Sequence, residues 1–325
     1  MFKHAFLALF CLPLAGCFNG FTIVPTHLEG PLEETVVQEA MKGWTRHKVA
    51  LIDVSGLIMN AHKPGLLSDG ENPVSVFREK LQTAADDPDV KAVVVRINSP
   101  GGGVTASDIM YRDLRDFRQR TNKPVVACMM DVAASGGYYL ATACDSVYAH
   151  PGTVTGSIGV IMSLYNAEGL ATKLGIESNP IKSGPNKDLM NPARKMTKSE
   201  RQILQGIVDQ FYGQFVAVVA EGRHLPPERV REIADGRIYS ATEAKQLGLI
   251  DQIGYLDDAI AEAKLRANVR HAKVIAYDRS AGSSGTIYAA APRIPSEINV
   301  KLNVPGLSLP TAGAQFMYLW QPGGE

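Results

Sequence analysis

Three short apolar runs constrain the fold of this 325-residue chain more than any other feature. Residues 49–54, 92–97 and 125–130 each have the length of a strand and are apolar at nearly every position. Such runs are typical of strands in a parallel sheet that helices cover on both faces. A helical pattern lies over residues 73–85, and strands and helices alternate to about residue 278. The sequence therefore predicts an α/β fold of right-handed crossover units around a parallel core sheet, with additional helices.

Glycine-rich turns follow the second and third of these runs. Gly101, Gly102 and Gly103 end the first turn, and Ser135 precedes Gly136 in the second. Ligands of parallel sheets gather at the carboxyl ends of strands, and glycine lets the backbone turn its N–H groups toward a ligand. The lysine and hydroxyl of a phosphate-binding loop are missing, so an oxyanion hole fits better. Its expected donors are Gly136 and either Gly101 or Gly102, and tight turns that bind nothing are the alternative.

Ser135 stands at the predicted strand-to-helix turn and is the candidate nucleophile. The Gly-x-Ser-x-Gly and His-Glu-x-x-His patterns of other hydrolases are absent. The groups that could accept its proton are His150, Lys182 and Lys187. A lysine acts as a base only when it is neutral, which requires a buried environment.

The N-terminus has the pattern of an export signal. Lys3 and His4 precede an apolar stretch over residues 5–14, which is too short for a bilayer that requires about 20 residues. Residues 14–17 resemble the bacterial lipoprotein signal, in which the cysteine, here Cys17, is acylated and becomes the mature N-terminus. An ordinary signal peptide is the alternative. We expect a signal peptide over 1–16, a lipidated spacer with a short helical pattern over 17–46, and a lipid-anchored protein facing the periplasm or cell exterior.

Composition limits the remaining possibilities. The chain is 45% hydrophobic and 20% charged with a net charge of zero, which favours a globular domain and no nucleic-acid partner. No Cys/His cluster has the spacing of a metal site, so we expect no metal and no cofactor. Cys128 and Cys144 remain after removal of the signal and acylation of Cys17, either as two buried thiols or as one bridge.

The second half of the chain contains one clear helix start. Thr197 and Glu200 form a capping-box pattern that opens a helix with an apolar stripe. Beyond residue 280 the chain is rich in Ser, Gly, Pro and Ala. We therefore expect a domain over residues 47–280 and a poorly ordered tail over 281–325.

Four segments together resemble the signal peptide peptidase A, or protease IV, family in its short form. They are residues 98–103, 134–139, 155–160 and 182–188. The resemblance implies the crotonase/Clp-protease fold and a serine endopeptidase with a Ser–Lys dyad. By position, Ser135 matches the nucleophile and Lys187 the base, which makes Lys182 a bystander. Ser157 matches the hydroxyl that orients the lysine, and the glycines match the oxyanion donors.

The resemblance also implies partners and substrates. These are signal-peptide remnants and other exported polypeptides, with apolar residues near the cleaved bond, and a ring-like homo-oligomer whose active sites lie between subunits. The chain departs from the family in its lipoprotein-type anchor, since many members begin with a transmembrane helix, and it lacks the tandem duplication of the long members. A non-catalytic membrane scaffold and an acyl-CoA enzyme of the same broad fold are the alternatives, and export argues against the second.

Overall fold

The computed structural model describes residues 31–40, 45–61, 71–279 and 316–320. The expected signal peptide, Cys17 and most of the expected tail lie outside these residues.

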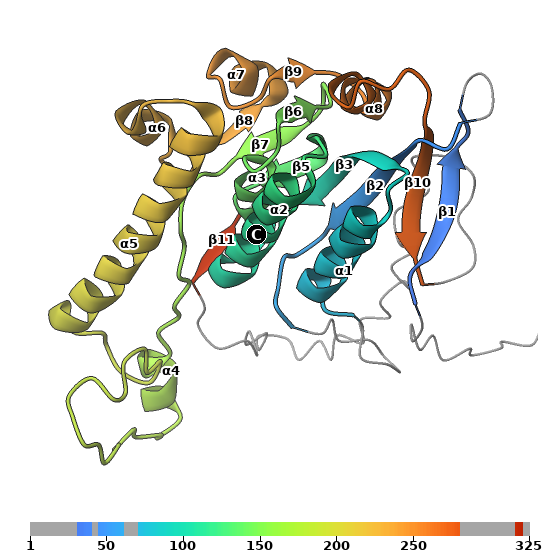
Figure 1. The fold of residues 1–325 in the computed structure, drawn as a ribbon. Helices are drawn as coiled ribbons and strands as arrows, with labels where there is room; N and C mark the ends of the chain where they lie inside the picture. Colours follow the sequence, from blue (N-terminus) through green and yellow to red (C-terminus); the bar gives the residue numbers. More distant parts are fainter. Residues whose placement is uncertain (1–30, 41–44, 62–70, 280–315, 321–325) are drawn as a thin grey trace, which may run out of the picture.

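A nine-stranded sheet forms the centre of the molecule (Figure 1). Its main path runs β1-β10-β2-β3-β5-β6-β9; off this path, β7 pairs with β5, and β8 pairs with β7. The pairs within β10-β2-β3-β5-β6-β9 are parallel, as is β5 with β7, which confirms the predicted parallel core. The strands are β1 (Glu33–Gln38), β2 (Lys48–Ser55), β3 (Val90–Ser99), β5 (Val125–Ala134), β6 (Ser146–Ala149), β7 (Val154–Gly156), β8 (Ile238–Ser240), β9 (Gln252–Ile253) and β10 (Lys273–Asp278).

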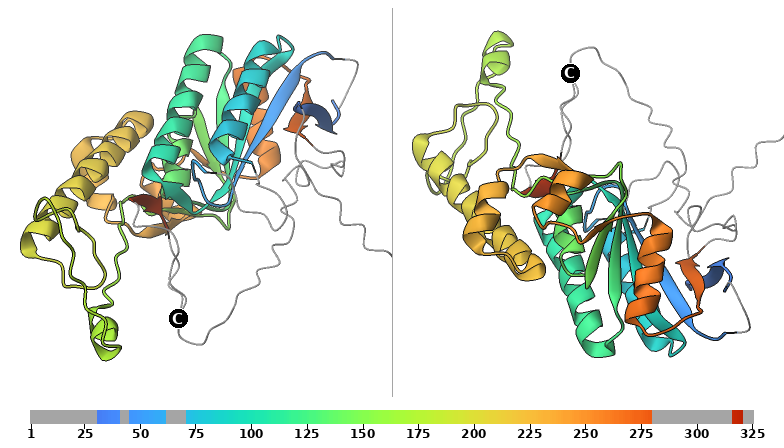
Figure 2. Two further views of the ribbon diagram at one scale, coloured as in Figure 1. Left: turned by 90° about the horizontal axis from the view of Figure 1, so that it is seen from below. Right: turned by 90° about the horizontal axis from the view of Figure 1, so that it is seen from above.

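Helices cover both faces of the sheet, which explains why its central strands are apolar at successive positions (Figures 1 and 2). Alternate residues of a strand point to opposite faces. In β3, Val93 and Val95 join the core under α1 (Pro73–Asp86), α2 (Val104–Thr121) and α3 (Gly136–Ala141), whereas Val94 joins the core under α8 (Leu256–Arg266). The remaining helices are α4 (Glu168–Lys173), α5 (Lys198–Arg223), α6 (Pro227–Ile233) and α7 (Ala241–Gln246).

Two segments differ from the sequence expectation. Residues 33–38, expected in a spacer with a helical pattern, form β1, which pairs antiparallel with β10 at the sheet edge. The run Thr35, Val36 and Val37 favours a strand because β-branched side chains fit a pleated surface, and Val37 is buried against the sheet. Residues 317–319, expected in a poorly ordered tail, form β11 (Met317–Leu319), which pairs with β4 (Gly101–Gly103) in a second, two-stranded sheet.

A long projection leaves the body of the molecule between β7 and α5. We call residues 162–197 the arm; it carries α4 and extends away from the sheet in all three views (Figures 1 and 2). The helix after it, α5, begins at the predicted capping box of Thr197 and Glu200. By length and composition α5 is apolar enough to cross a membrane, but core helices of soluble proteins meet the same criterion. In this structure 28% of the most apolar 18-residue window of α5 is buried.

Candidate active site

Ser135 lies where β5 ends and α3 begins, as the sequence predicts. Its backbone has φ 51° and ψ −115°, a conformation that costs a non-glycine residue about 1–3 kcal/mol and persists where the surrounding structure enforces it. The Ser135 N–H donates to the Gly156 carbonyl at 2.8 Å, which ties the turn to β7. The side chain is 1% exposed, and its Oγ has no hydrogen-bond partner among the described residues. A strained serine between a strand and a helix is also the geometry of the nucleophile elbow, built here without the Gly-x-Ser-x-Gly pattern.

The two glycine turns meet beside Ser135. A Cβ on Gly136 would lie 2.3 Å from the Ser107 hydroxyl and 3.2 Å from the Gly102 nitrogen. A Cβ on Gly101, whose φ is +100°, would lie 2.6 Å from the Gly136 nitrogen. No side chain fits at these contacts, so glycine is required on both turns. The structure therefore brings together the three glycines that the sequence proposed as oxyanion donors.

Hydrogen bonds distinguish among the amides of the first turn. The Gly101 N–H donates to the Ser99 hydroxyl at 3.0 Å, and the Gly103 N–H donates to the Ile58 carbonyl at 2.9 Å. Gly102 lies opposite Tyr318 in the pairing of β4 with β11, so its amide faces the other edge of the strand. The sequence left open whether Gly101 or Gly102 is the oxyanion donor of this turn. Of these two, Gly102 has the amide that a ligand in the place of β11 would meet.

Lys187 does not lie at this site in the single chain. It is exposed on the arm, its backbone N–H donates to the Gly184 carbonyl at 3.2 Å, and the Ser135 hydroxyl is unpartnered. Lys182 is paired instead with Asp188, its Nζ lying 2.6 Å from the carboxylate. Lys182 is thus held in an ion pair within the arm.

The base of the arm is held by charged groups. Arg194 bonds Asp188 at 2.9 Å and also bonds Glu200. The bonds from Arg194 and from the Thr197 backbone lower the pKa of Glu200 to about 2, and bonds from Arg194 and Lys182 hold the pKa of Asp188 well below its usual range. The arm carries large apolar side chains that are exposed in the single chain: Leu164, Tyr165, Leu170, Leu174, Ile176 and Ile181.

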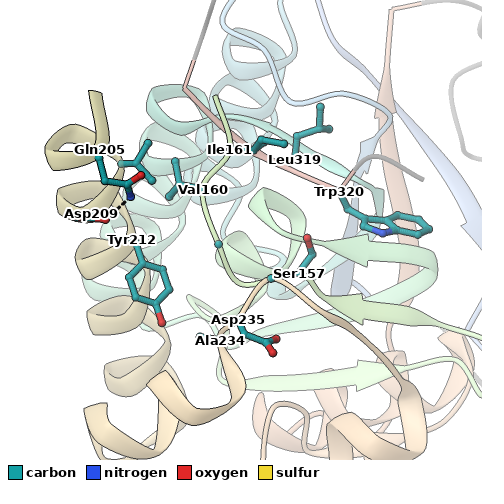
Figure 3. Close-up of a pocket in the computed structure, with 13 residues that line it drawn as sticks. Ser157, Val160, Ile161, Gln205, Asp209, Tyr212, Ala234, Asp235, Leu319 and Trp320 are labelled. Carbon is teal, nitrogen blue, oxygen red and sulfur yellow. Dashed lines mark hydrogen bonds between the residues drawn. The ribbon is translucent and has the colours of Figure 1, made fainter. Parts of the chain in front are cut away.

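Ser157 and His150 occupy different surroundings. Ser157 follows β7 with φ 49°, and its N–H donates to the Arg237 carbonyl at 2.7 Å. It lines a cavity of about 490 Å³, with Leu319 and Trp320 on one side and residues of α5 on the other (Figure 3). The His150 Nδ1 accepts a hydrogen bond from the Gly152 N–H, and its ring packs on Tyr255. Because the Ser135 hydroxyl has no partner among the described residues, His150 makes no hydrogen bond to it in this structure.

Cys128 and Cys144 are free, buried thiols rather than a bridge. Burial raises the pKa of Cys128 to about 12 and raises that of Cys144 as well, so neither is a nucleophile at neutral pH. Within the described ranges, no group of three or more His, Cys, Asp or Glu side chains could hold a metal ion.

Sequence reasoning missed the contribution of the C-terminal segment to this site. The apolar run over residues 316–320 could have indicated a strand, but no local signal names its partner. Only the structure shows that it lies on the glycine strand β4.

The covered parallel sheet with glycine turns at its strand ends defines an α/β enzyme of the crotonase/Clp-protease type. Comparisons with known proteins identify the group within this class. A model of the family described as Peptidase family S49 matches residues 117–270. The chain is 37% identical over 245 residues to the Enterococcus faecium protein named "Putative signal peptide peptidase SppA". The aligned region covers 75% of this chain and 70% of that protein.

Two further relatives agree. "Protease 4" of Salmonella typhi is 34% identical over 68% of this chain and 35% of its own length. The Arabidopsis thaliana protein named "Serine protease SPPA, chloroplastic" is 34% identical over 70% of this chain and 35% of its own length. The chain belongs to peptidase family S49, the signal peptide peptidase A or protease IV family, and is a serine peptidase.

Proposed function

We propose that this protein is an endopeptidase in which Ser135 is the nucleophile and Lys187 the general base. The observation that carries the proposal is the Ser135 hydroxyl, which is buried, unpartnered and held on a strained turn beside the Gly102 and Gly136 amides. The buried Ser107 hydroxyl is unpartnered too, so it is the strained turn and the adjacent amides that set Ser135 apart as a nucleophile.

The chemistry follows from these roles. The neutral Lys187 amine takes the Ser135 proton as Oγ attacks the carbonyl carbon of a peptide bond. The Gly102 and Gly136 amides stabilise the oxyanion, and one such donor contributes about 3–4 kcal/mol to transition-state stabilisation. The C–N bond then breaks, and the lysine returns the proton to the leaving amine. Water hydrolyses the resulting ester, which frees Ser135 and releases the new carboxylate.

Lys187 reaches Ser135 from a second copy of the chain in this proposal. Support comes from its place on the arm, which extends away from its own Ser135 turn and carries exposed apolar side chains (Figures 1 and 2). Packing of the arm on a neighbouring copy would bury these side chains and disfavour the charged ammonium form of a lysine beside them. Ser157 is then the hydroxyl that orients the amine.

The same proposal includes an acylated Cys17 that holds the exported protein at a membrane surface. Its substrates are apolar peptides such as signal-peptide remnants and other exported polypeptides. An apolar substrate suits the cavity beside Ser157, whose lining includes Val160, Leu319 and Trp320. Metabolic labelling with a radioactive fatty acid tests the anchor: Cys17→Ser should lose the label, and a label that persists contradicts acylation at this residue.

Mixed oligomers test the shared dyad. Ser135→Ala and Lys187→Ala should each abolish peptide cleavage, whereas Lys182→Ala retains it. Ser135→Ala and Lys187→Ala subunits, co-expressed in equal amounts, should recover about a quarter of the parental activity, because about a quarter of neighbouring pairs then combine an intact serine with an intact lysine.

Three results would contradict the proposal. A silent mixed oligomer that assembles normally places both dyad residues in one chain. Full activity of Lys187→Ala assigns the base elsewhere. A parent protein that neither cleaves peptides nor reacts with a fluorophosphonate favours the non-catalytic scaffold.

A further inference from the structure

Ser107 has a buried hydroxyl to which the proposed mechanism gives no role. The side chain is fully buried in α2, and its Oγ has no hydrogen-bond partner among the described residues. Two other buried hydroxyls in the described ranges share this state, those of Ser135 and Tyr277. Tyr277 belongs to β10, two strands away from β3, whereas Ser107 and Ser135 both adjoin Gly136. Two unpartnered hydroxyls therefore gather at one glycine of the candidate site.

Hydroxyls in comparable positions of this chain do form hydrogen bonds. A serine or threonine inside a helix can donate to the carbonyl four residues earlier. Three helical threonines do so, at 3.0, 2.8 and 2.9 Å: Thr83, Thr121 and Thr172. Thr142, which is buried like Ser107, donates to the Tyr139 carbonyl at 2.6 Å. Ser107 has the Gly103 carbonyl four residues before it and makes no such bond.

The Ser107 hydroxyl lies against the backbone of both glycine turns. The point at which a Cβ on Gly136 would stand is 2.3 Å from Ser107 Oγ. The same point is 3.2 Å from the Gly102 nitrogen and 3.2 Å from the Gly101 Cα. Ser107 Oγ thus borders the small space between the two turns. It stands beside the backbone that carries both candidate oxyanion donors, the amides of Gly102 and Gly136.

An unpartnered hydroxyl at this place lowers the stability of the folded protein. A buried polar group without a partner is less favourable than an apolar group in the same position. Alanine would occupy this position of α2 without that penalty. The hydroxyl therefore calls for an explanation other than folding. Groups that are retained although they destabilise the fold cluster at active sites, where they interact during the reaction.

We propose that Ser107 is a positioning residue of the oxyanion hole. The inference rests on the proposed function, in which the Gly102 and Gly136 amides bind the oxyanion. A hydroxyl can rotate, and no bond fixes the hydrogen of this one. As negative charge develops on the substrate oxygen, the hydroxyl turns its hydrogen toward that charge and strengthens the field of the two amides. No such charge exists before Ser135 attacks, so Ser107 raises kcat and leaves KM nearly unchanged.

Ser107→Ala in the full-length protein tests this role by two results of opposite sign. Peptide cleavage should show a kcat lowered at least about 10-fold at nearly constant KM. Thermal unfolding should show a Tm raised by about 2–4 °C, because the unpartnered oxygen is gone. Thr142→Val is the matched control, since it removes a buried hydroxyl that has a partner. It should lower the Tm and leave kcat unchanged.

Ser107→Thr separates the hydroxyl from packing. This variant keeps the hydroxyl and should retain a higher kcat than Ser107→Ala. A role in packing alone predicts the reverse order, because alanine fits between α2 and α3 whereas threonine overfills the space. That reverse order overturns the inference. So does a Ser107→Ala variant with parental kcat, or one in which kcat and Tm fall together.

Reaction with a fluorophosphonate distinguishes failure of this inference from failure of the proposed function. The reagent bonds an activated serine without any peptide, and Ser107→Ala should slow this reaction about 10-fold. A parental rate in Ser107→Ala, beside a Ser135→Ala variant that does not react, overturns the inference alone. A parent protein that reacts but cleaves no peptide refutes the endopeptidase, and the reagent rate then decides the role of Ser107. A parent that does neither overturns both proposals.

Discussion

At the scale of single residues, the candidate site depends on backbone contacts that leave no room for a side chain. Gly136 approaches the buried Ser107 hydroxyl, and Gly101 needs both its positive φ and its closeness to Gly136. Both positions are therefore restricted to glycine by geometry. The strain stored at Ser135 is maintained because β7 and α3 hold the turn from both sides.

Gly136→Ala should test this geometry. The new methyl group would lie 2.3 Å from Ser107 Oγ and 3.2 Å from the Gly102 nitrogen, so the hydroxyl must rotate and the turn must give way, and we expect a loss of about 1–3 kcal/mol of folding free energy. The shift also displaces the Gly136 amide, so kcat should fall at least about 100-fold.

Peptide cleavage and urea unfolding are the measurements for this variant. Gly152→Ala is the matched control, because the atom nearest to its new methyl group would be His150 Nδ1, at an ordinary van der Waals distance of 3.5 Å. Parental activity in Gly136→Ala would show that this amide is not an oxyanion donor.

At the scale of elements, the junction of the arm with α5 is an electrostatic clamp. Glu200 closes the capping box with Thr197 and also bonds Arg194, which in turn holds Asp188. The pKa of Glu200 in the folded protein is about 2, below its ordinary value of 4.5. A carboxyl with a lowered pKa stabilises the folded state fully above its ordinary value and loses this contribution as the pH falls.

The clamp should therefore loosen between pH 4.5 and about 2, and amide hydrogen exchange over residues 162–197 should speed up there at constant temperature. Glu200→Gln keeps an acceptor for the capping box but removes the charge, so its arm should exchange faster than the parent's already at pH 6. Glu177→Gln, a change at an exposed residue of the arm, is the control. Equal exchange in Glu200→Gln and the parent at pH 6 would mean that this ion pair does not hold the arm.

At the scale of the whole molecule, two apolar layers share one sheet. Cys128 points into the layer under α8, and Cys144 lies in the layer under α1, α2 and α3. Because both thiols are buried, their reactivity reports on the opening of each layer.

Neither thiol should react with a disulfide reagent at pH 8 in the folded protein, since burial raises the pKa of each. In a protein without residues 1–16 and with Cys17→Ser, both should react in a single transition as urea increases. That transition should coincide with the loss of helical circular dichroism if the layers unfold together. Reaction of one thiol at lower urea concentration would show that its layer opens separately.

Much of the fold was predictable because its signals are local. The apolar runs predicted β2, β3 and β5, and the pattern over residues 73–85 predicted α1, since the period of apolar residues reports which faces are buried. Thr197 and Glu200 predicted the start of α5 because a capping box satisfies the amides of its own first turn. The start of α2 carries no such signal, since Gly103 stands at its N-cap position and no side chain caps the helix.

The sequence by itself determined the layered α/β fold, the strand-to-helix turn at Ser135 and the need for glycine around it. Tertiary structure decided which distant segments meet. It placed β1 on β10 and β11 on β4, directed the Gly102 amide rather than that of Gly101 toward β11, and set the arm away from the sheet. The physical reason is that periodicity and capping act within a few turns of chain, whereas strand pairing and pocket filling depend on contacts between residues far apart in sequence.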